Sequence, residues 1–176
     1  MVKGEIYRAV GIDYGTVRIG VAVSDDLGML AHPFETVPAK NTKEGIARLV
    51  EIVSERKAEV LVLGLPLNMD GSEGAAVKKV RKFKDALRRA LPPAVKIVEE
   101  DERLTTVSAM DKLKDAGQSE KESRESIDQA AATEILQTYL DYREPSEEQM
   151  DDDMKKNEGS PLNGDLEIFY DDETYG

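Results

Sequence analysis

The eight residues EVLVLGLP (59–66) form a nearly unbroken apolar run between two amphipathic segments. A strand with this pattern is covered on both faces of its sheet, which is typical of parallel strands joined by crossover helices. Residues 42–57 precede it with the spacing of a helix. After it, the polar loop NMDGSEG leads into a second helix, which the prolines at 92 and 93 end. Its expected core stripe is Ala76, Val80, Phe83 and Leu87. These features predict an α/β protein.

Further strand and helix patterns complete the predicted sheet. Two strands, 5–13 and 18–24, are separated by a tight turn, and proline-bounded residues 33–38 predict a short peripheral strand. Another strand is expected at 94–101, and the last two helices are expected at 105–117 and 126–143. A hairpin followed by crossover helices predicts a mixed five-stranded sheet with helices on both faces.

The acidic charge of the chain is concentrated at its end. The 176 residues carry a formal net charge of −12, but residues 144–176 hold 12 acidic residues against two lysines, which leaves only −2 for residues 1–143. We expect 1–143 to form one domain and 144–176 to be an acidic, disordered extension. The charge of the domain therefore does not exclude a nucleic-acid partner.

Composition also limits the kind of site and the location. The chain contains no cysteine, so any metal ion would have oxygen or nitrogen ligands. No apolar run approaches the roughly 20 residues of a membrane span, and the N-terminus lacks the pattern of a signal peptide. We expect a cytoplasmic protein with no membrane partner.

Three acidic residues stand where an unpaired carboxylate would be costly. Asp13 lies inside the apolar first strand, Glu102 ends the acidic run after the strand at 94–101, and Asp128 is on the inward stripe of the last helix. In sheets with crossover helices, ligands bind beyond the carboxyl ends of the strands. The strand period also places Glu100 and Glu102 on one face.

Inward carboxylates repel one another unless a cation lies between them. Mg²⁺ and Mn²⁺ take hard oxygen ligands from carboxylates and phosphates. Two such ions about 3.5–4 Å apart would clamp the in-line attack of water on a phosphodiester. The three residues together therefore predict a site for two divalent ions.

Each carboxylate taken singly has a structural alternative. Asp13 is as consistent with a hydrogen-bonded turn as with a ligand, an acidic strand end is often solvated, and a lone Asp128 is often structural. Asp128 is not needed as a helix cap, because Ser119 and Glu122 match a capping box upstream. The metal hypothesis rests on the three residues in combination.

Four segments, in order, resemble the YqgF-type family of Holliday-junction-resolvase-like proteins, also described as pre-16S rRNA nucleases. They are GIDYGTVRIGVAVSD (11–25), LVLGLPLNMDGSEG (61–74), DERLTTVSA (101–109) and IDQAAATEILQTYL (127–140). The resemblance covers residues 6–142. It implies a ribonuclease H-like fold, with Asp13, Glu102 and Asp128 as the catalytic and metal-binding triad.

The resemblance also implies a function, with alternatives. The first is a metal-dependent endonuclease acting on structured nucleic acid, in the processing of the 5′ end of pre-16S ribosomal RNA, as a monomer or homodimer. The others are a DNA junction resolvase in recombination or repair, and a non-catalytic assembly factor. GIDYGT also resembles the phosphate loop of actin-like ATPases and sugar kinases, but those proteins need two such domains. One departure is Val17, where the family commonly has a basic residue before Arg18.

Other polar side chains are candidates for contacts with nucleic-acid phosphates. Arg18, Ser72 and Arg103 are three of them; Ser72 is alternatively an N-cap, and Arg103 alternatively pairs with a nearby acid. The second helix presents a basic face that either follows the phosphate backbone or is merely solvated. Its candidate residues are Lys78, Arg81, Lys82 and Arg89.

Overall fold

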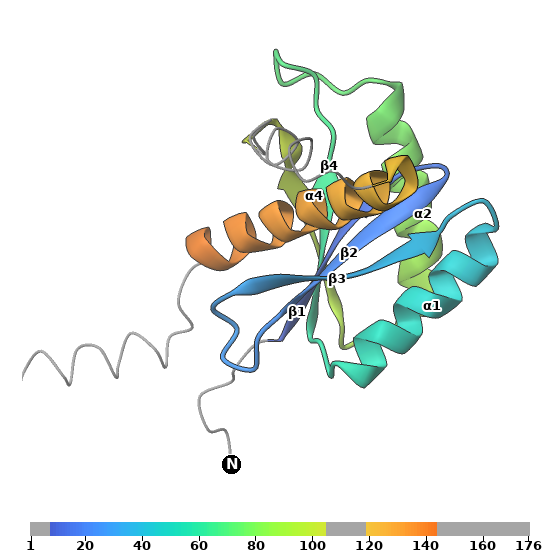
Figure 1. Cartoon of the computed structure of the whole chain (residues 1–176). Helices are drawn as coiled ribbons and strands as arrows, with labels where there is room; N and C mark the ends of the chain where they lie inside the picture. Colours follow the sequence, from blue (N-terminus) through green and yellow to red (C-terminus); the bar gives the residue numbers. More distant parts are fainter. Residues whose placement is uncertain (1–7, 105–118, 144–176) are drawn as a thin grey trace, which may run out of the picture. The chain divides into compact units, whose positions relative to one another are not determined.

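The computed structural model describes residues 8–104 and 119–143. The helix expected at 105–117 and the acidic segment 144–176 lie outside the described residues. The elements, labelled as in Figure 1, are β1 Ala9–Tyr14, β2 Arg18–Ser24, β3 Ala31–Pro38, α1 Thr42–Glu55, β4 Val60–Leu65, α2 Ala75–Ala90, β5 Lys96–Asp101, the 3₁₀ turn η1 Glu102–Leu104 and α4 Glu120–Tyr142.

The strands form one mixed sheet of five strands in the order β3-β2-β1-β4-β5. β1 and β3 are antiparallel to β2, whereas β1, β4 and β5 run parallel to one another. The backbone N–H of Gly15 donates to the carbonyl of Arg18 at 2.9 Å and closes the β1–β2 turn. The predicted mixed five-stranded sheet with helices on both faces is confirmed.

Two apolar layers cover the sheet. α1 and α2 pack on one face and α4 on the other, as Figure 1 shows with the sheet between them. Strand alternation divides each strand between these layers. In β1, Val10 and Ile12 belong to the core under α1 and α2, whereas Ala9 belongs to the smaller core under α4. Asp13, two residues on from Gly11, therefore faces α4.

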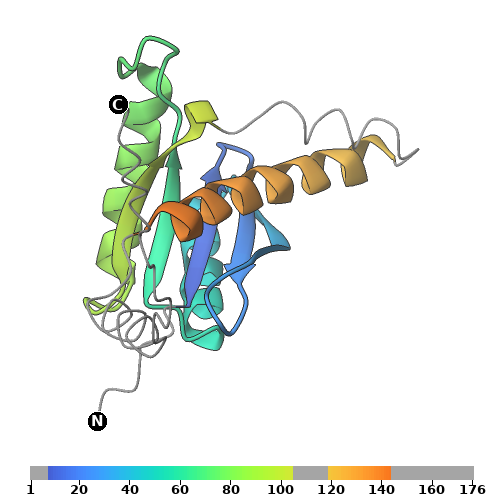
Figure 2. The same ribbon diagram turned by 90° about the vertical axis from the view of Figure 1, so that its left-hand side faces the viewer.

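Glycines let α4 lie very close to the strands. A Cβ added to Gly11 would stand 2.6 Å from the Cβ of Leu136, and one added to Gly20 would stand 1.9 Å from the carbonyl oxygen of Asp128. Neither distance is possible for a real side chain. Figure 2 shows the consequence, with α4 crossing in front of the sheet. These small residues fix the position of the α4 backbone, and with it the position of Asp128.

The helix starts differ in detail from the sequence prediction. α4 begins at Glu120, six residues before the expected start, because the predicted capping box of Ser119 and Glu122 is present. In α2 the buried stripe begins at Val77, and Ala76 is exposed, so the prediction for Ala76 was wrong.

Within 8–104 and 119–143, none of the helices is long and apolar enough to cross a membrane.

Candidate active site

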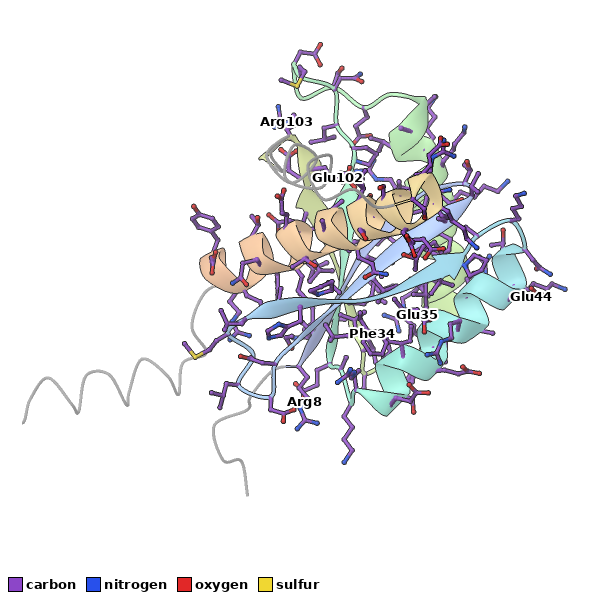
Figure 3. All side chains as sticks on the ribbon, in the orientation of Figure 1. Arg8, Phe34, Glu35, Glu44, Glu102 and Arg103 are labelled. Carbon is purple, nitrogen blue, oxygen red and sulfur yellow. The ribbon has the colours of Figure 1, made fainter. Side chains whose placement is uncertain are left out.

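The three candidate carboxylates come from three elements at the same end of the sheet. Asp13 is the penultimate residue of β1, and Glu102 follows the last residue of β5, so both lie at carboxyl ends of parallel strands. Asp128 comes from the first half of α4. Figure 3 labels Glu102 at the end of β5, beside α4. The side chains of all three residues are partly buried.

Asp13 and Glu102 share a hydrogen bond. Burial, then the charge of Asp13 and this hydrogen bond, raise the pKa of Glu102 from its ordinary 4.5 to about 8. Burial also raises the pKa of Asp13, as does the charge of Asp128, while the hydrogen bond from Glu102 opposes this rise. At neutral pH, Glu102 is therefore the protonated partner that donates to an ionised Asp13. Two carboxylates in contact cannot both ionise without a cation.

Asp128 has a different partner. The Nε of Arg18 donates to Oδ2 of Asp128 at 2.6 Å, across 110 residues of sequence. Arg18 is the first residue of β2, and Gly20, two residues later on the same face, lies under the backbone of Asp128. The candidate phosphate ligand Arg18 is thus bound to one of the candidate metal ligands.

A glycine near the carboxyl end of β4, Gly64, leaves room for Glu102. A Cβ on Gly64 would stand 2.3 Å from Oε1 of Glu102 and 2.5 Å from the Cδ1 of Ile135. Gly20 and Gly64 are therefore parts of the site that the sequence analysis missed. The signal was available, because a single glycine inside a strand often marks a close approach of another group.

The donor set fits a divalent cation, although the three side chains are not gathered around one point. Nowhere in 8–104 or 119–143 do three His, Asp or Glu side chains already form a group that could hold a metal ion. Asp128 pairs with Arg18, and its negative charge also raises the pKa of Asp13. Oxygen donors that repel one another are the ligands that Mg²⁺ or Mn²⁺ would stabilise. The three-carboxylate metal site stays a prediction.

Arg103 and Ser72 both have partners within the protein. The guanidinium of Arg103 binds the carboxylate of Asp101 through Nε at 2.9 Å and Nη2 at 2.7 Å, so the ion-pair alternative is the one observed. The hydroxyl of Ser72 donates to Asp70 at 2.6 Å. The N-cap of α2 is Gly74, so the alternative of Ser72 as the cap was wrong.

The basic side chains of α2 divide into two groups. Arg81 pairs with Glu73 at 2.6 Å and lies 3.6 Å from Glu99, and these carboxylates hold it on the β5 side of the helix. By contrast, three candidates are exposed and have neither a hydrogen bond nor an ion pair to any other described residue. They are Lys78, Lys82 and Arg89.

Known proteins are similar to most of this chain. Residues 7–142 match the family described as "RuvX: Holliday junction resolvase". The chain is 49% identical over 142 residues to a protein of Nocardia farcinica, covering 77% of this chain and 78% of the relative. It is 47% identical over 138 residues to one of Myxococcus xanthus, covering 78% and 90%. Both relatives are named "Putative pre-16S rRNA nuclease".

Solved structures give only distant similarity. The Thermus thermophilus RuvC complex with a Holliday junction substrate aligns with a TM-score of 0.46 at 17% identity, over 76% of this chain and 93% of that one. The fowlpox virus Holliday junction resolvase aligns with a TM-score of 0.47 at 13% identity, over 77% and 99%.

Proposed function

The chain belongs to the RuvX Holliday junction resolvase family, and from this premise we propose that it is a divalent-metal-dependent endonuclease that hydrolyses phosphodiester bonds in structured nucleic acid. We propose the 5′ end of pre-16S ribosomal RNA as its substrate, in the cytoplasm, because the relatives carry a pre-16S rRNA nuclease name. The family description favours a branched DNA junction as the second candidate.

The observation that carries this proposal is the pairing at the carboxyl ends of β1 and β5. Asp13 is hydrogen-bonded to a protonated Glu102, and the charge of Asp128 acts on Asp13 from α4. A partly buried acidic pair of this kind is costly as a structural element. An acid whose pKa is strongly raised, as that of Glu102 is, at the carboxyl end of a parallel sheet is typical of a reactive site.

Asp13, Glu102 and Asp128 are the residues that would hold Mg²⁺ or Mn²⁺. When bound, the metal would supply a nucleophilic water at neutral pH and neutralise charge on the phosphate. Glu102 must first give up the proton that it shares with Asp13, because a ligand carboxylate binds metal in its ionised form. Asp128 must leave Arg18, and an arriving phosphate is a competing partner for that guanidinium.

The test is a cleavage assay on both candidate substrates. Purified protein is incubated with a pre-16S 5′ leader RNA or a four-way DNA junction, in Mg²⁺ or Mn²⁺, beside the Asp13→Asn variant. Asn keeps the size of the side chain and an acceptor for Glu102, but removes the charge that a metal requires. We expect cleavage of the RNA to fall by orders of magnitude in Asp13→Asn. Equal cleavage by both proteins would refute the mechanism, and cleavage of the junction alone would transfer it to DNA.

A further inference from the structure

A hollow of about 310 Å³ lies between the β1–β2 turn, the start of α1 and the exposed side of α2. Tyr14 and Phe83 form its apolar wall, with their rings stacked at a centroid distance of 4.3 Å and an angle of 19°. Apart from Ala86, the other contributors are polar, and they are Thr16, Thr42, Lys79, Lys82 and Arg89. The hollow therefore combines three cations and several hydroxyl groups with an aromatic wall, and no carboxylate lines it.

The three cations of the hollow have no anionic partner among the residues that the structure describes. Lys79, Lys82 and Arg89 follow one another at spacings of three and seven, so they share one side of α2. The opposite flank of the same helix is different, because Arg81 and Lys84 there pair with two carboxylates, Arg81 with Glu73 and Glu99 and Lys84 with Glu99. The exposed cations of α2 that lack a partner among the described residues, the three of the hollow and Lys78, are therefore concentrated on this side of the helix, where like charges repel unless an anion is bound.

The hollow and the carboxylates lie on opposite sides of one strand end. Tyr14 directly follows Asp13 in β1, and successive side chains of a strand point to opposite faces. Tyr14 packs against the core under α1 and α2, whereas Asp13 faces α4. An anion in the hollow would therefore lie near the candidate active site without touching the candidate metal ligands.

We propose that this hollow binds a non-scissile phosphodiester group of the nucleic-acid substrate, held by Lys79, Lys82 and Arg89. The inference rests on the proposed function, and it adds that the substrate backbone contacts both faces of the sheet at the end of β1. Two separated backbone contacts around one strand end suit a folded or branched nucleic acid better than a single extended strand. The free phosphate of a nucleotide has the same chemistry and is the other source of such an anion.

The test measures binding without cleavage. The affinity of the full chain for a fluorescent RNA hairpin is measured in EDTA over a range of salt concentrations, for wild type and for Lys82→Gln/Arg89→Gln. The control is Lys57→Gln/Lys96→Gln, which removes the same two positive charges from exposed lysines near the amino ends of β4 and β5. We expect the double variant to bind several-fold more weakly at low salt, and its slope of log affinity against log salt to fall by about one to two. The control is expected to match wild type.

The outcomes separate this inference from the proposed function. Unchanged affinity and salt slope in the double variant would overturn the inference, while the Asp13→Asn cleavage assay would still decide the nuclease. A second titration uses inorganic phosphate and a nucleoside monophosphate as probes. If these bind wild type but not the double variant, and the hairpin binds both proteins equally, the hollow is a free-phosphate site and the backbone proposal is wrong.

Discussion

Arg18 and Asp128 form a hydrogen-bonded ion pair of 2.6 Å that joins the start of β2 to α4. Both side chains are partly exposed, 36% and 22%, so the pair contributes at most about 1 kcal/mol to stability. Its consequence for function is larger, because it holds a candidate metal ligand and a candidate phosphate ligand together. In the free protein, Arg18 therefore competes with a metal ion for Asp128, and Asp128 competes with a phosphate for Arg18.

Replacing Arg18 with Met is expected to strengthen metal binding by the free protein. Met keeps an apolar stem but leaves the carboxylate of Asp128 without its cation, so Asp128 becomes available to a metal near Asp13. We expect the affinity for Mn²⁺, measured by calorimetry in the absence of nucleic acid, to rise several-fold. Binding of nucleic acid in EDTA should weaken, because a phosphate loses one arginine partner.

The matched control for this change is Arg8→Met. Arg8 precedes β1, so it lies at the opposite end of that strand from Asp13, and it pairs with Asp26 at 3.3 Å. Its removal changes the net charge of the protein by the same amount. Equal Mn²⁺ affinity in wild type and Arg18→Met, or an equal rise in both variants, would show that the pair does not restrain Asp128.

The partly buried pair of Asp13 and Glu102 makes stability depend on pH. In the unfolded chain Glu102 ionises near 4.5, but in the folded protein its pKa is about 8. Between these values the folded protein holds a proton that the unfolded chain has lost, so the free energy of unfolding decreases as pH rises from 4.5 to 8. Below this window both states are protonated, and the penalty is absent. The raised pKa of Asp13 acts in the same direction at lower pH.

This dependence is measured by denaturant unfolding in EDTA at several pH values across the window. We expect wild type to lose on the order of a few kcal/mol between its acidic and alkaline ends. Glu102→Gln cannot ionise and should remove most of the slope. A control of the same chemical kind is Glu44→Gln in the exposed first turn of α1. An identical slope in wild type and Glu102→Gln would contradict the shared proton.

Gly20→Ala should be strongly destabilising. The added Cβ would lie 1.9 Å from the carbonyl oxygen of Asp128, so either β2 or the backbone of α4 must move. We expect a cost of at least about 1–3 kcal/mol in the free energy of unfolding, as for overpacked cores. Because the same movement displaces Asp128, nucleic-acid cleavage should decrease as well.

Gly74→Ala provides the comparison for this variant. Its added Cβ would lie 3.3 Å from the side-chain amide of Asn68, which can move aside. The cost there should be distinctly smaller, within the range of a changed helix N-cap. If the two variants unfold at the same denaturant concentration, the close approach of α4 to β2 is not what requires Gly20.

Local sequence patterns determined most of the fold. The apolar run at 59–66 predicted the buried central strand β4, and the spacing of apolar residues predicted α1 and α2. The capping box at Ser119 was identifiable because its two residues are three positions apart. These features depend on neighbours in the chain, so a sequence alone reveals them. The exposure of Ala76 was mispredicted because one helical position separates it from the buried Val77.

Tertiary structure alone decided the partners of the charged groups. The motifs predicted that three acids share one site. They did not show that Glu102 is protonated and pairs with Asp13, or that Asp128 binds Arg18. Nor did the basic pattern of α2 reveal that Glu73 and Glu99 neutralise Arg81 and leave Lys82 unpaired. An ionic contact forms between side chains that the fold brings within a few ångströms, and its partners lie up to 110 residues apart in the chain. Periodicity carries no information about such distances, because they depend on how strands and helices are packed together.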